Sequence, residues 1–403
     1  MKKPKIRFKG FTETWEQRKL GDIVDIYDGI HQTPNYQNKG IMFLSVENIG
    51  TLQSTKYISK EDFEKYYKVY PQKNDILMTR IGDVGTTNIV TDDALKAYYV
   101  SLALLKYKST DAYFLSNAIQ SDYVQKELSI RTLITAIPKK INKDEIGKVD
   151  IILPNVLVEQ QKIGSCLKHL DHLITLHQRK CENLKKLKKF MLQKLFPQNG
   201  ENVPKVRFLN FTDTWEQRKF GEIVIIERGG SPRPIDKFIT DDESGLNWIK
   251  IGDAPKSGNY ITNTKEKIIT EGLSKTREVY PGDLILSNSM SFGKPYIMGI
   301  RGCIHDGWLL IRDSNNEFDL MYLCYMLGTD TMLYQYKSMA AGSTVNNLNK
   351  ELVGNTYVKY PSMLEQEQIG SFFSKLDHLI TLHQRKCDKL KEVKKYMLQN
   401  MFA

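Results

Sequence analysis

The sequence predicts an α+β protein of two similar halves, each with a mixed α/β domain followed by a long helix. Two internal repeats carry this prediction. Residues 159–196 recur as 365–402 with 25 of 38 positions identical, and residues 5–26 recur as 205–226 with 15 of 22 identical. The segments between these repeats differ from each other but keep similar landmarks in the same order. The chain is therefore built from one duplicated, pseudo-symmetric unit.

The repeated segment 159–196 predicts a long helix that packs against another helix. Neither copy contains proline, and apolar or small residues recur at steps of four and three, which aligns them along one seam. At 1.5 Å per residue, a helix from Ile163 to Leu195 is a rod of roughly 50 Å. Since both copies have the same seam, we expect the two helices to be partners in a coiled coil. The apolar seam residues are Ile163, Leu167, Leu170, Ile174 and Leu184 in the first copy, and Ile369, Phe373, Leu376, Ile380 and Leu390 in the second.

The repeats also set the expected domain boundaries. A first domain covers 1–157 and a central helix covers 158–196. The segment 197–204, PQNGENVP, is polar and contains proline and glycine, which is typical of a linker. A second domain covers 205–363, and the C-terminal helix covers 364–403.

Within each domain, strands are expected at 40–46 and 245–251, where β-branched and aromatic residues gather. Helices are expected at 111–130 and 318–340. The flanking repeat also contains a short helix signal in each copy.

In the first copy, Thr14 and Gln17 fit a capping box, and Gly21 fits the helix stop. We expect Trp15 and Trp215 to pack into the domain base.

Composition limits the class of protein. The net charge of +11 favours an acidic partner such as nucleic acid, although solubility alone also accounts for such a surplus. No apolar run approaches the roughly 18 residues of a membrane span, and the start MKKPKIRFKG does not resemble a signal peptide. Five scattered cysteines suit a reducing cytoplasm.

Motifs of common enzymes are missing from the sequence. There is no GxxxxGK[ST] phosphate loop, no GxGxxG after a strand, and no HExxH, GxSxG or [DN]PP[YF]. Acidic and lysine pairs such as Asp283 with Lys294 are too common in loops to indicate a nuclease. We therefore expect no catalytic residue and no cofactor bound by this chain.

Basic and amide side chains near the predicted strand ends are the candidates for DNA contact. Lysine and arginine suit phosphates and guanine edges, while asparagine and glutamine suit adenine edges. Taken singly, each of these residues also fits a solvated turn. The candidates in the first half are Gln32, Thr33, Arg80, Thr86, Thr87, Asn88, Lys139, Lys140 and Asn142. Those in the second half are Ser231, Arg233, Ser287, Asn288, Ser289, Lys294, Ser343, Thr344, Asn346 and Asn347.

Two pairs on the helix seam have the spacing of metal ligands. His177 and Cys181 are four residues apart on one face, and His383 with Cys387 repeats the pair. Facing each other, the two pairs would form a zinc-compatible Cys₂His₂ set. The interpretation that the sequence favours is that these are seam residues that fix helix register, without a metal.

The chain resembles the specificity (S) subunit of type I restriction–modification enzymes over its whole length. The paired flanks TWEQRKLGDI and TWEQRKFGEI and the paired helix core LDHLITLHQRKC carry this resemblance. The landmarks KNDILMTRIGDVG and PGDLILSNSMSFG also agree with it.

The resemblance implies two target recognition domains, each binding one half of a bipartite site in double-stranded DNA. It also implies that the long helices pack antiparallel as a ruler and dock two methyltransferase (M) subunits. Two restriction (R) subunits complete such a complex. S-adenosylmethionine, ATP and magnesium belong to those partners, and the specificity subunit itself is not catalytic. Glycine-containing loops at equivalent early positions of the two domains, DGIHQTPNYQNKG (28–40) and RGGSPRPIDKF (228–238), differ in sequence. We therefore expect an asymmetric target, whose base sequence cannot be read from this chain.

Three other interpretations stay open at this point. The chain could be a coiled-coil adaptor that binds a different acidic macromolecule, in which case it would leave no footprint on DNA. It could also be a nuclease or methyltransferase with an unfamiliar site, and the isolated chain would then be active with metal or methyl donor. A specificity subunit whose partners are encoded elsewhere is a third possibility.

Overall fold

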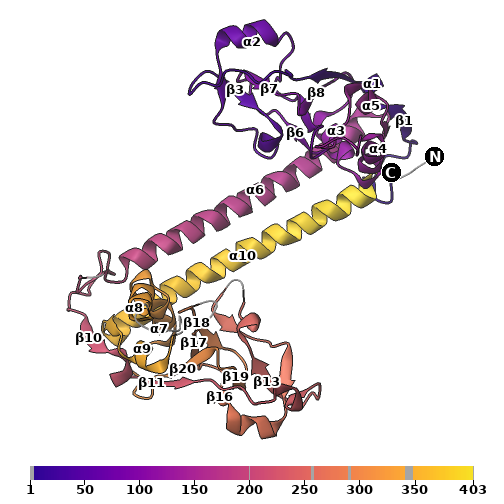
Figure 1. Ribbon diagram of the computed structural model, residues 1–403. Helices are drawn as coiled ribbons and strands as arrows, with labels where there is room; N and C mark the ends of the chain where they lie inside the picture. Colours follow the sequence, from indigo (N-terminus) through magenta and orange to yellow (C-terminus); the bar gives the residue numbers. More distant parts are fainter. Residues whose placement is uncertain (1–3, 199, 256–257, 289–291, 341–347, 403) are drawn as a thin grey trace. The chain divides into compact units, whose positions relative to one another are not determined.

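The computed structural model describes residues 4–198, 200–255, 258–288, 292–340 and 348–402, and Figure 1 draws its helices and strands. The chain divides into two compact units. Unit 1 contains residues 1–177 and 386–403, and unit 2 contains residues 178–385. Each unit therefore combines one mixed α/β domain with parts of both long helices.

Unit 1 contains a four-stranded sheet of order β2-β8-β5-β6, a three-stranded sheet of order β4-β3-β7, and the antiparallel pair β1-β9. Its strands are β1 (Glu16–Lys19), β2 (Val24–Asp28), β3 (Ile41–Leu44), β4 (Tyr57–Ile58), β5 (Ile76–Thr79), β6 (Thr87–Ile89), β7 (Lys96–Tyr98), β8 (Leu102–Tyr107) and β9 (Asp150–Leu153). Its short helices are α1 (Leu20–Ile23), the 3₁₀ helix η1 (Val46–Asn48), α2 (Lys60–Tyr66), α3 (Ala112–Ile119), α4 (Asp122–Arg131) and α5 (Lys143–Gly147).

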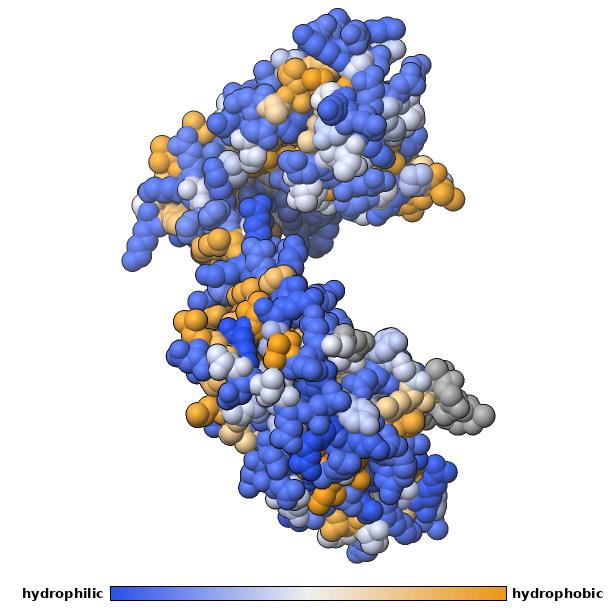
Figure 2. Space-filling model, turned by 90° about the vertical axis from the view of Figure 1, so that its left-hand side faces the viewer, coloured by the Kyte–Doolittle hydropathy of each residue, from blue (hydrophilic) through white to orange (hydrophobic). Residues whose placement is uncertain are grey.

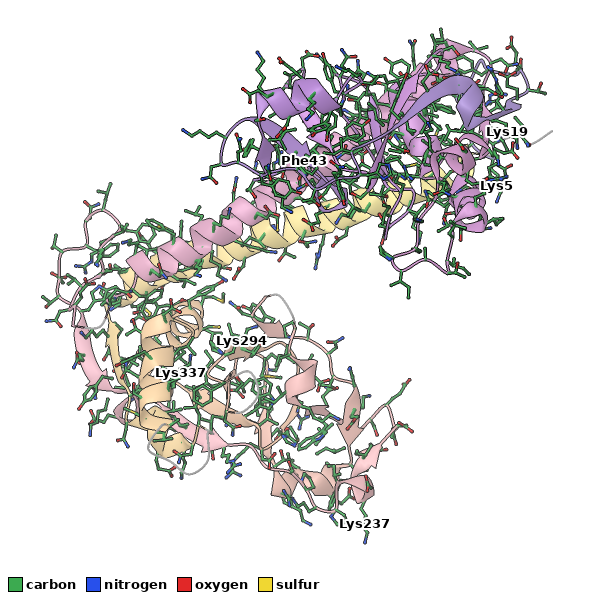
Figure 3. The ribbon with its side chains drawn as sticks, turned by 45° about the horizontal axis from the view of Figure 1, so that its top comes forward. Lys5, Lys19, Phe43, Lys237, Lys294 and Lys337 are labelled. Atoms are coloured by element: carbon green, nitrogen blue, oxygen red, sulfur yellow. The ribbon has the colours of Figure 1, made fainter. Side chains whose placement is uncertain are left out.

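The four-stranded sheet of unit 1 is buried on both faces. Because successive side chains of a strand point to opposite faces, Ile76 and Met78 of β5 join a core cluster that also contains Trp15 and Phe114. Leu77 joins the cluster around Phe43, which Figure 3 labels. The helices α3 and α4 cover the first face, and the three-stranded sheet covers the second.

Unit 2 repeats this arrangement with two five-stranded sheets, of order β11-β20-β17-β18-β14 and β12-β15-β13-β19-β16, and the pair β10-β21. Its strands are β10 (Glu216–Lys219), β11 (Ile225–Arg228), β12 (Ile239–Thr240), β13 (Leu246–Ile249), β14 (Tyr260–Ile261), β15 (Glu266–Ile268), β16 (Arg277–Val279), β17 (Leu284–Ser287), β18 (Pro295–Met298), β19 (Gly302–Ile304), β20 (Trp308–Arg312) and β21 (Tyr357–Tyr360). Its helices are α7 (Leu320–Leu327), α8 (Asp330–Ala340), α9 (Lys350–Gly354) and the 3₁₀ helices η2 (Phe220–Glu222), η3 (Ile235–Lys237), η4 (Ile251–Asp253) and η5 (Thr270–Lys275).

The long helices α6 (Leu157–Lys194) and α10 (Met363–Met401) run antiparallel within each unit. In unit 1, Lys394 of α10 bonds to both carboxylate oxygens of Asp171 of α6 at 2.7 and 2.8 Å. In unit 2, Lys188 of α6 bonds to both oxygens of Asp377 of α10, each at 2.7 Å. Asp171 and Lys188 are 17 positions apart on α6, and Asp377 and Lys394 are 17 positions apart on α10. The two ion pairs therefore fit helices that run in opposite directions.

The far end of each long helix packs on the domain of the other repeat. Phe402 lies in the core of unit 1, with its ring centroid 5.4 Å from that of Phe114. Phe196, its counterpart in the first repeat, lies in the core of unit 2, with its ring centroid 5.5 Å from that of Tyr322. Each domain core is therefore completed by residues from the end of a helix in the other repeat.

Several expectations from the sequence are confirmed. Every residue on the predicted seam of the two long helices is buried or half-buried. Trp15 and Trp215 lie in the core clusters of their units. The expected strands at 40–46 and 245–251 are β3 and β13.

The expected short helix after Thr14 is wrong. Residues 16–19 form strand β1, which pairs antiparallel with β9, and only a four-residue helix follows it. The capping-box signal was overridden because this segment gains a full ladder of hydrogen bonds with β9. The expected helix at 111–130 is two helices, since Ser121 caps a second one by accepting from the backbone of Val124.

Candidate nucleic-acid interface

Three loops of unit 1 meet around the buried side chain of Arg80. The guanidinium bonds to Asp28, where the loop 29–40 begins. Its Nε donates to the backbone oxygen of Ile141 at 3.2 Å, at the end of the loop after α4. Arg80 itself begins the loop between β5 and β6. One side chain therefore fixes the relative positions of three connections at one edge of the domain.

Unit 2 holds the equivalent edge together with a different residue. Asn288 follows β17 as Arg80 follows β5, and its side-chain amide donates to the backbone oxygen of Asp306 at 2.8 Å. The backbone N–H of Leu348 donates to the oxygen of Asn288 at 3.1 Å, as that of Ile141 donates to Arg80 at 3.0 Å. The scaffold of this edge is shared, while the side chains that organise it differ between the units.

A glycine lies in the turn after β5 in unit 1 and in the turn after β17 in unit 2. Gly85 and Gly293 have φ values of +97° and +73°, in the region that only glycine enters without strain. A Cβ on either would also come within 3.0 Å of side chains from the following helices. Both turns therefore press closely against α4 or α8.

Many of the predicted contact residues lie on the surface at this edge. The predicted contact residues that are exposed are Gln32, Thr33, Thr86, Lys139, Lys140, Asn142, Arg233 and Lys294. Lys294, labelled in Figure 3, also lies with its Nζ 4.8 Å from the centre of the Tyr296 ring. Asn88 and Ser231 are half-buried, and the Asn88 amide donates to the backbone oxygen of Ile49 at 2.7 Å.

Four predicted contact residues are buried and hydrogen-bonded inside the protein, so their polar groups are already engaged there. They are Arg80, Thr87, Ser287 and Asn288. Arg80 and Asn288 organise loops as described above. The Thr87 hydroxyl lies 2.9 Å from that of Ser116, and the Ser287 hydroxyl accepts from the backbone of Lys294 at 3.1 Å. Sequence alone could not separate a loop-holding polar residue from one that faces outward.

The remaining candidates lie outside the described residues. They are Ser289, Ser343, Thr344, Asn346 and Asn347.

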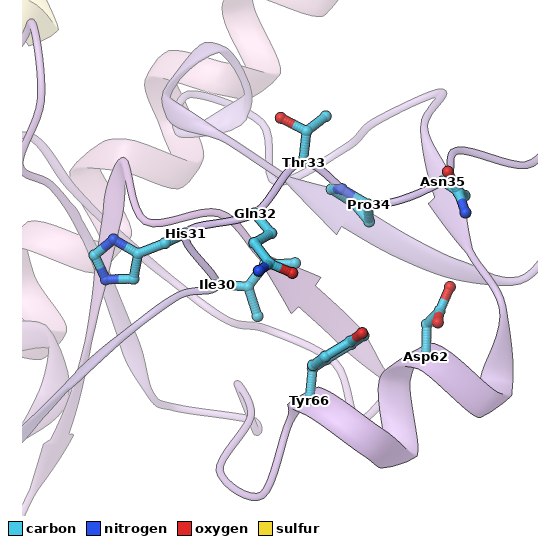
Figure 4. Close-up of a pocket in the computed structure, with 8 residues that line it drawn as sticks. All are labelled: Ile30, His31, Gln32, Thr33, Pro34, Asn35, Asp62 and Tyr66. Atoms are coloured by element: carbon cyan, nitrogen blue, oxygen red, sulfur yellow. The ribbon is translucent and has the colours of Figure 1, made fainter.

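The loop 29–40 forms one wall of a cavity of about 500 Å³ in unit 1. Figure 4 shows Asp62 and Tyr66 on one face of α2, pointing toward this loop, which contributes Gln32 and Thr33. Tyr66 is exposed, with Lys65 Nζ 5.0 Å from the centre of its ring. The cavity thus combines an aromatic face, a carboxylate and amide groups.

Unit 2 has a cavity of about 850 Å³ beside the corresponding loop, which contributes Ser231 and Arg233. Its wall contains an ion pair between Lys250 and Glu266. His305 Nδ1 lies 2.8 Å from an oxygen of Asp306, and the His305 ring packs edge-on against Trp248 at 5.7 Å between centroids. These wall residues come from separate later segments of the chain, around β13, β15 and β19, which the fold brings beside the loop.

The described residues contain no group of three or more His, Cys, Asp or Glu side chains placed to hold a metal ion. On the seam, Cys181 is buried, and its sulfur lies 3.6 Å from Gln384 Oε1 and 3.9 Å from the backbone oxygen of Ile380. Burial raises the pKa of the Cys303 and Cys324 thiols to about 12. Both therefore stay protonated near neutral pH, which removes them as nucleophiles.

A search of the described residues found no helix with the length and apolar character needed to cross a membrane. Figure 2 shows a surface that is mainly hydrophilic, with separate hydrophobic patches.

Comparison with known proteins gives a consistent family. Residues 12–186 and 212–392 both match the sequence profile described as type I restriction modification DNA specificity domain. The type I restriction enzyme MjaVIII specificity subunit of Methanocaldococcus jannaschii is 22% identical over 405 residues, which covers 96% of this chain and 91% of that protein. A putative MjaX specificity subunit of the same organism is also 22% identical, over 96% of this chain and 92% of the relative.

Solved structures agree on the fold. The crystal structure of the S subunit of a type I restriction–modification system from M. genitalium matches with a TM-score of 0.67 at 15% identity, covering 100% of this chain and 99% of that one. A chain from a structure concerned with complex assembly and conformational transition of a type I system matches with a TM-score of 0.54 at 15% identity, covering 96% and 97%.

Proposed function

Because this chain belongs to the type I restriction–modification DNA specificity family, we propose that it reads an asymmetric, two-part DNA target, with one half-site for each unit. The observation that carries the proposal is the repeated edge with unlike loops. Arg80 and Asn288 hold equivalent loop connections, but the loops 29–40 and 229–238 share little sequence. A common scaffold with different loops gives two readers of different specificity.

The exposed side chains at these edges divide into two roles. Lys139, Lys140 and Lys294 supply positive charge for phosphates, which fixes the register of the protein without reading sequence. The Gln32 and Asn142 amides can both donate and accept, and the Arg233 guanidinium donates, so these side chains suit base edges in the major groove. The positive net charge of the chain, +11, adds long-range attraction to DNA.

We further propose that the long helices set the distance between the half-sites. α6 contains 38 residues and α10 contains 39, and the seam of each is a rod of roughly 50 Å. A rod of this length corresponds to a spacing between half-site centres of about one to one and a half turns of DNA, at roughly 34–36 Å per turn. The base pairs in the gap would not be read.

The same helices offer two equivalent surfaces for a pair of identical partners. Leu187 and Phe190 lie three residues apart on one face of α6, and both are exposed. Their counterparts in the second repeat, Val393 and Tyr396, are exposed on α10. Large apolar residues exposed at matching positions of both repeats fit docking by two copies of one protein, which we propose is the methyltransferase subunit.

In this proposal the chain itself is not catalytic and binds no cofactor. S-adenosylmethionine would be held by the two methyltransferase subunits, and ATP and magnesium by the two restriction subunits. The complex would act on DNA in the cytoplasm.

Mapping methylated adenines across the genome, with the gene for this chain intact and deleted, tests the proposal. The expected result is one two-part sequence that is methylated only when the chain is present. Exchanging residues 28–142 for those of another specificity subunit should change one half-site and leave the other intact. Methylation that persists without the chain, or a pattern with no two-part sequence, would refute it.

A further inference from the structure

The end of α4 and the loop between α4 and α5 expose large apolar side chains. Ile134 and Ile137 are 78% and 99% exposed, and Ile130 and Leu133 beside them are exposed as well. Single exposed apolar residues are common on protein surfaces, but four within the eight positions from the last turn of α4 to Ile137 indicate a contact surface.

This loop is held at its base. The N–H of Leu133 donates to the oxygen of Lys140 at 2.8 Å, and the N–H of Gly82 donates to the oxygen of Lys139 at 2.8 Å. Because Ile141 in turn bonds to Arg80, the base is tied to the edge that carries the other candidate contacts. The tip, residues 134–138, therefore projects from a fixed base within the proposed DNA-binding edge.

The charge around the tip favours nucleic acid as its partner. Lys139 and Lys140 follow directly, both exposed, and across the described part of the chain no ion pair involves either of them. A stable protein interface needs roughly 800 Å² on each side, which a tip of five residues does not provide. An apolar tip flanked by cations matches the side chains that insert between base pairs while lysines hold the phosphates.

Resting on the proposed function, we propose that Ile134 and Ile137 insert as a wedge between two stacked base pairs of the half-site read by unit 1. Insertion would remove two branched apolar side chains from water and bend the duplex at that step, which brings more of it against the cationic loops.

The second repeat lacks this feature in its sequence. Its segment 341–347 reads AGSTVNN, in which Val345 is the single branched apolar residue. The wedge is therefore expected at one half-site only, and the bend in the DNA should be asymmetric.

The test places 2-aminopurine, a base whose fluorescence rises when it is unstacked, at successive positions of the mapped target. The full chain is bound to these duplexes in complex with its methyltransferase subunits. Emission should rise at the adenines to be methylated, which such enzymes extrude, and at one further step in the half-site of unit 1. In the Ile134→Ala/Ile137→Ala variant the rise at that further step should disappear, while the rise at the methylated adenines should remain. Affinity should fall about tenfold.

Leu209→Ala is the matched control, because Leu209 is 88% exposed on unit 2; it should change neither signal. A wild-type complex with no unstacked step besides the methylated adenines would overturn the wedge while leaving the proposed function intact. Loss of the methyltransferase subunits from the double variant would also overturn it, and would assign the loop to a protein partner. Failure of the wild-type complex to bind the target at all would instead refute the proposed function.

Discussion

Lys188 and Asp377 form a two-oxygen ion pair between the long helices, with both N–O distances 2.7 Å. The Tyr325 hydroxyl donates to the same carboxylate at 2.6 Å, and its ring centre lies 4.8 Å from Lys188 Nζ. The counterpart pair in unit 1, Lys394 with Asp171, has the same geometry. The Asp171 side chain is 48% exposed, whereas the Asp377 side chain is 22% exposed.

We therefore expect Lys188→Met to destabilise unit 2 by about 1–2 kcal/mol, because it leaves a partly buried carboxylate without its cation. Lys394→Met should cost less than about 1 kcal/mol, since water solvates Asp171. Hydrogen exchange of the paired helix segments measures both. Equal effects of the two substitutions would contradict the role given to burial.

A second prediction concerns Glu159, whose side chain is fully buried and accepts from Arg7 at 2.6 and 2.8 Å. Glu159→Ala would leave the Arg7 guanidinium without this partner, at a cost of about 3–5 kcal/mol. Glu159→Gln keeps one acceptor and should cost less. Urea unfolding measures both, and the repeat provides the matched pair Arg207 with Glu365 at 2.7 Å. If Glu365→Ala left the free energy of unfolding unchanged, these ion pairs would not anchor the helices.

Arg80 is predicted to act on specificity without touching DNA. Arg80→Gln removes the bonds to Asp28 and Ile141, so three loops lose their common anchor. We expect weaker and less selective recognition at the half-site of unit 1, by about tenfold in affinity. Recognition at the other half-site serves as the internal control, measured by binding to targets with single base changes in each half. An equal loss at both half-sites would indicate global destabilisation.

Alkaline pH should destabilise unit 2 through its buried thiols. The pKa of Cys303 is about 12 in the folded chain, against an ordinary value of 9.0. Between these values the folded state binds more protons than the unfolded state, so stability is fully present below pH 9 and falls as pH rises toward 12. In this pH range each such thiol lowers the free energy of unfolding by about 1.4 kcal/mol per pH unit. Cys303→Ala should make the decline in urea stability between pH 9 and 10.5 shallower, and an unchanged slope would refute the assignment.

The core packing of Phe402 gives a further test. Phe402→Ala should destabilise unit 1 by about 3–5 kcal/mol, because it empties a site against Phe114. Tyr396→Ala, at an exposed position of the same helix, is the control and should cost little. Hydrogen exchange of α3, which contains Phe114, reports on the stability of unit 1. A loss of stability confined to unit 2 would contradict the packing seen here.

The long helices could be predicted from sequence because their pattern is local and repeated. Burial of Ile163 and Phe373 follows directly from the seven-residue period. Residues 16–19 could not be assigned in this way, since their partner β9 lies more than 130 residues away. Arg80 shows the same limit at the candidate site. Its type suits DNA contact, and only the fold reveals that Asp28 and Ile141 surround it.

The placement of Phe402 also governs the order in which the protein matures. When the first domain has been synthesised as far as β9, the residues that complete its core have not yet been made. Met401 and Phe402 are added about 250 residues later. Until then, the cleft beside Phe114 stays open in the nascent chain and exposes apolar surface. The first domain to be synthesised is therefore completed together with the last, which makes a truncated translation product a natural client of chaperones and proteases.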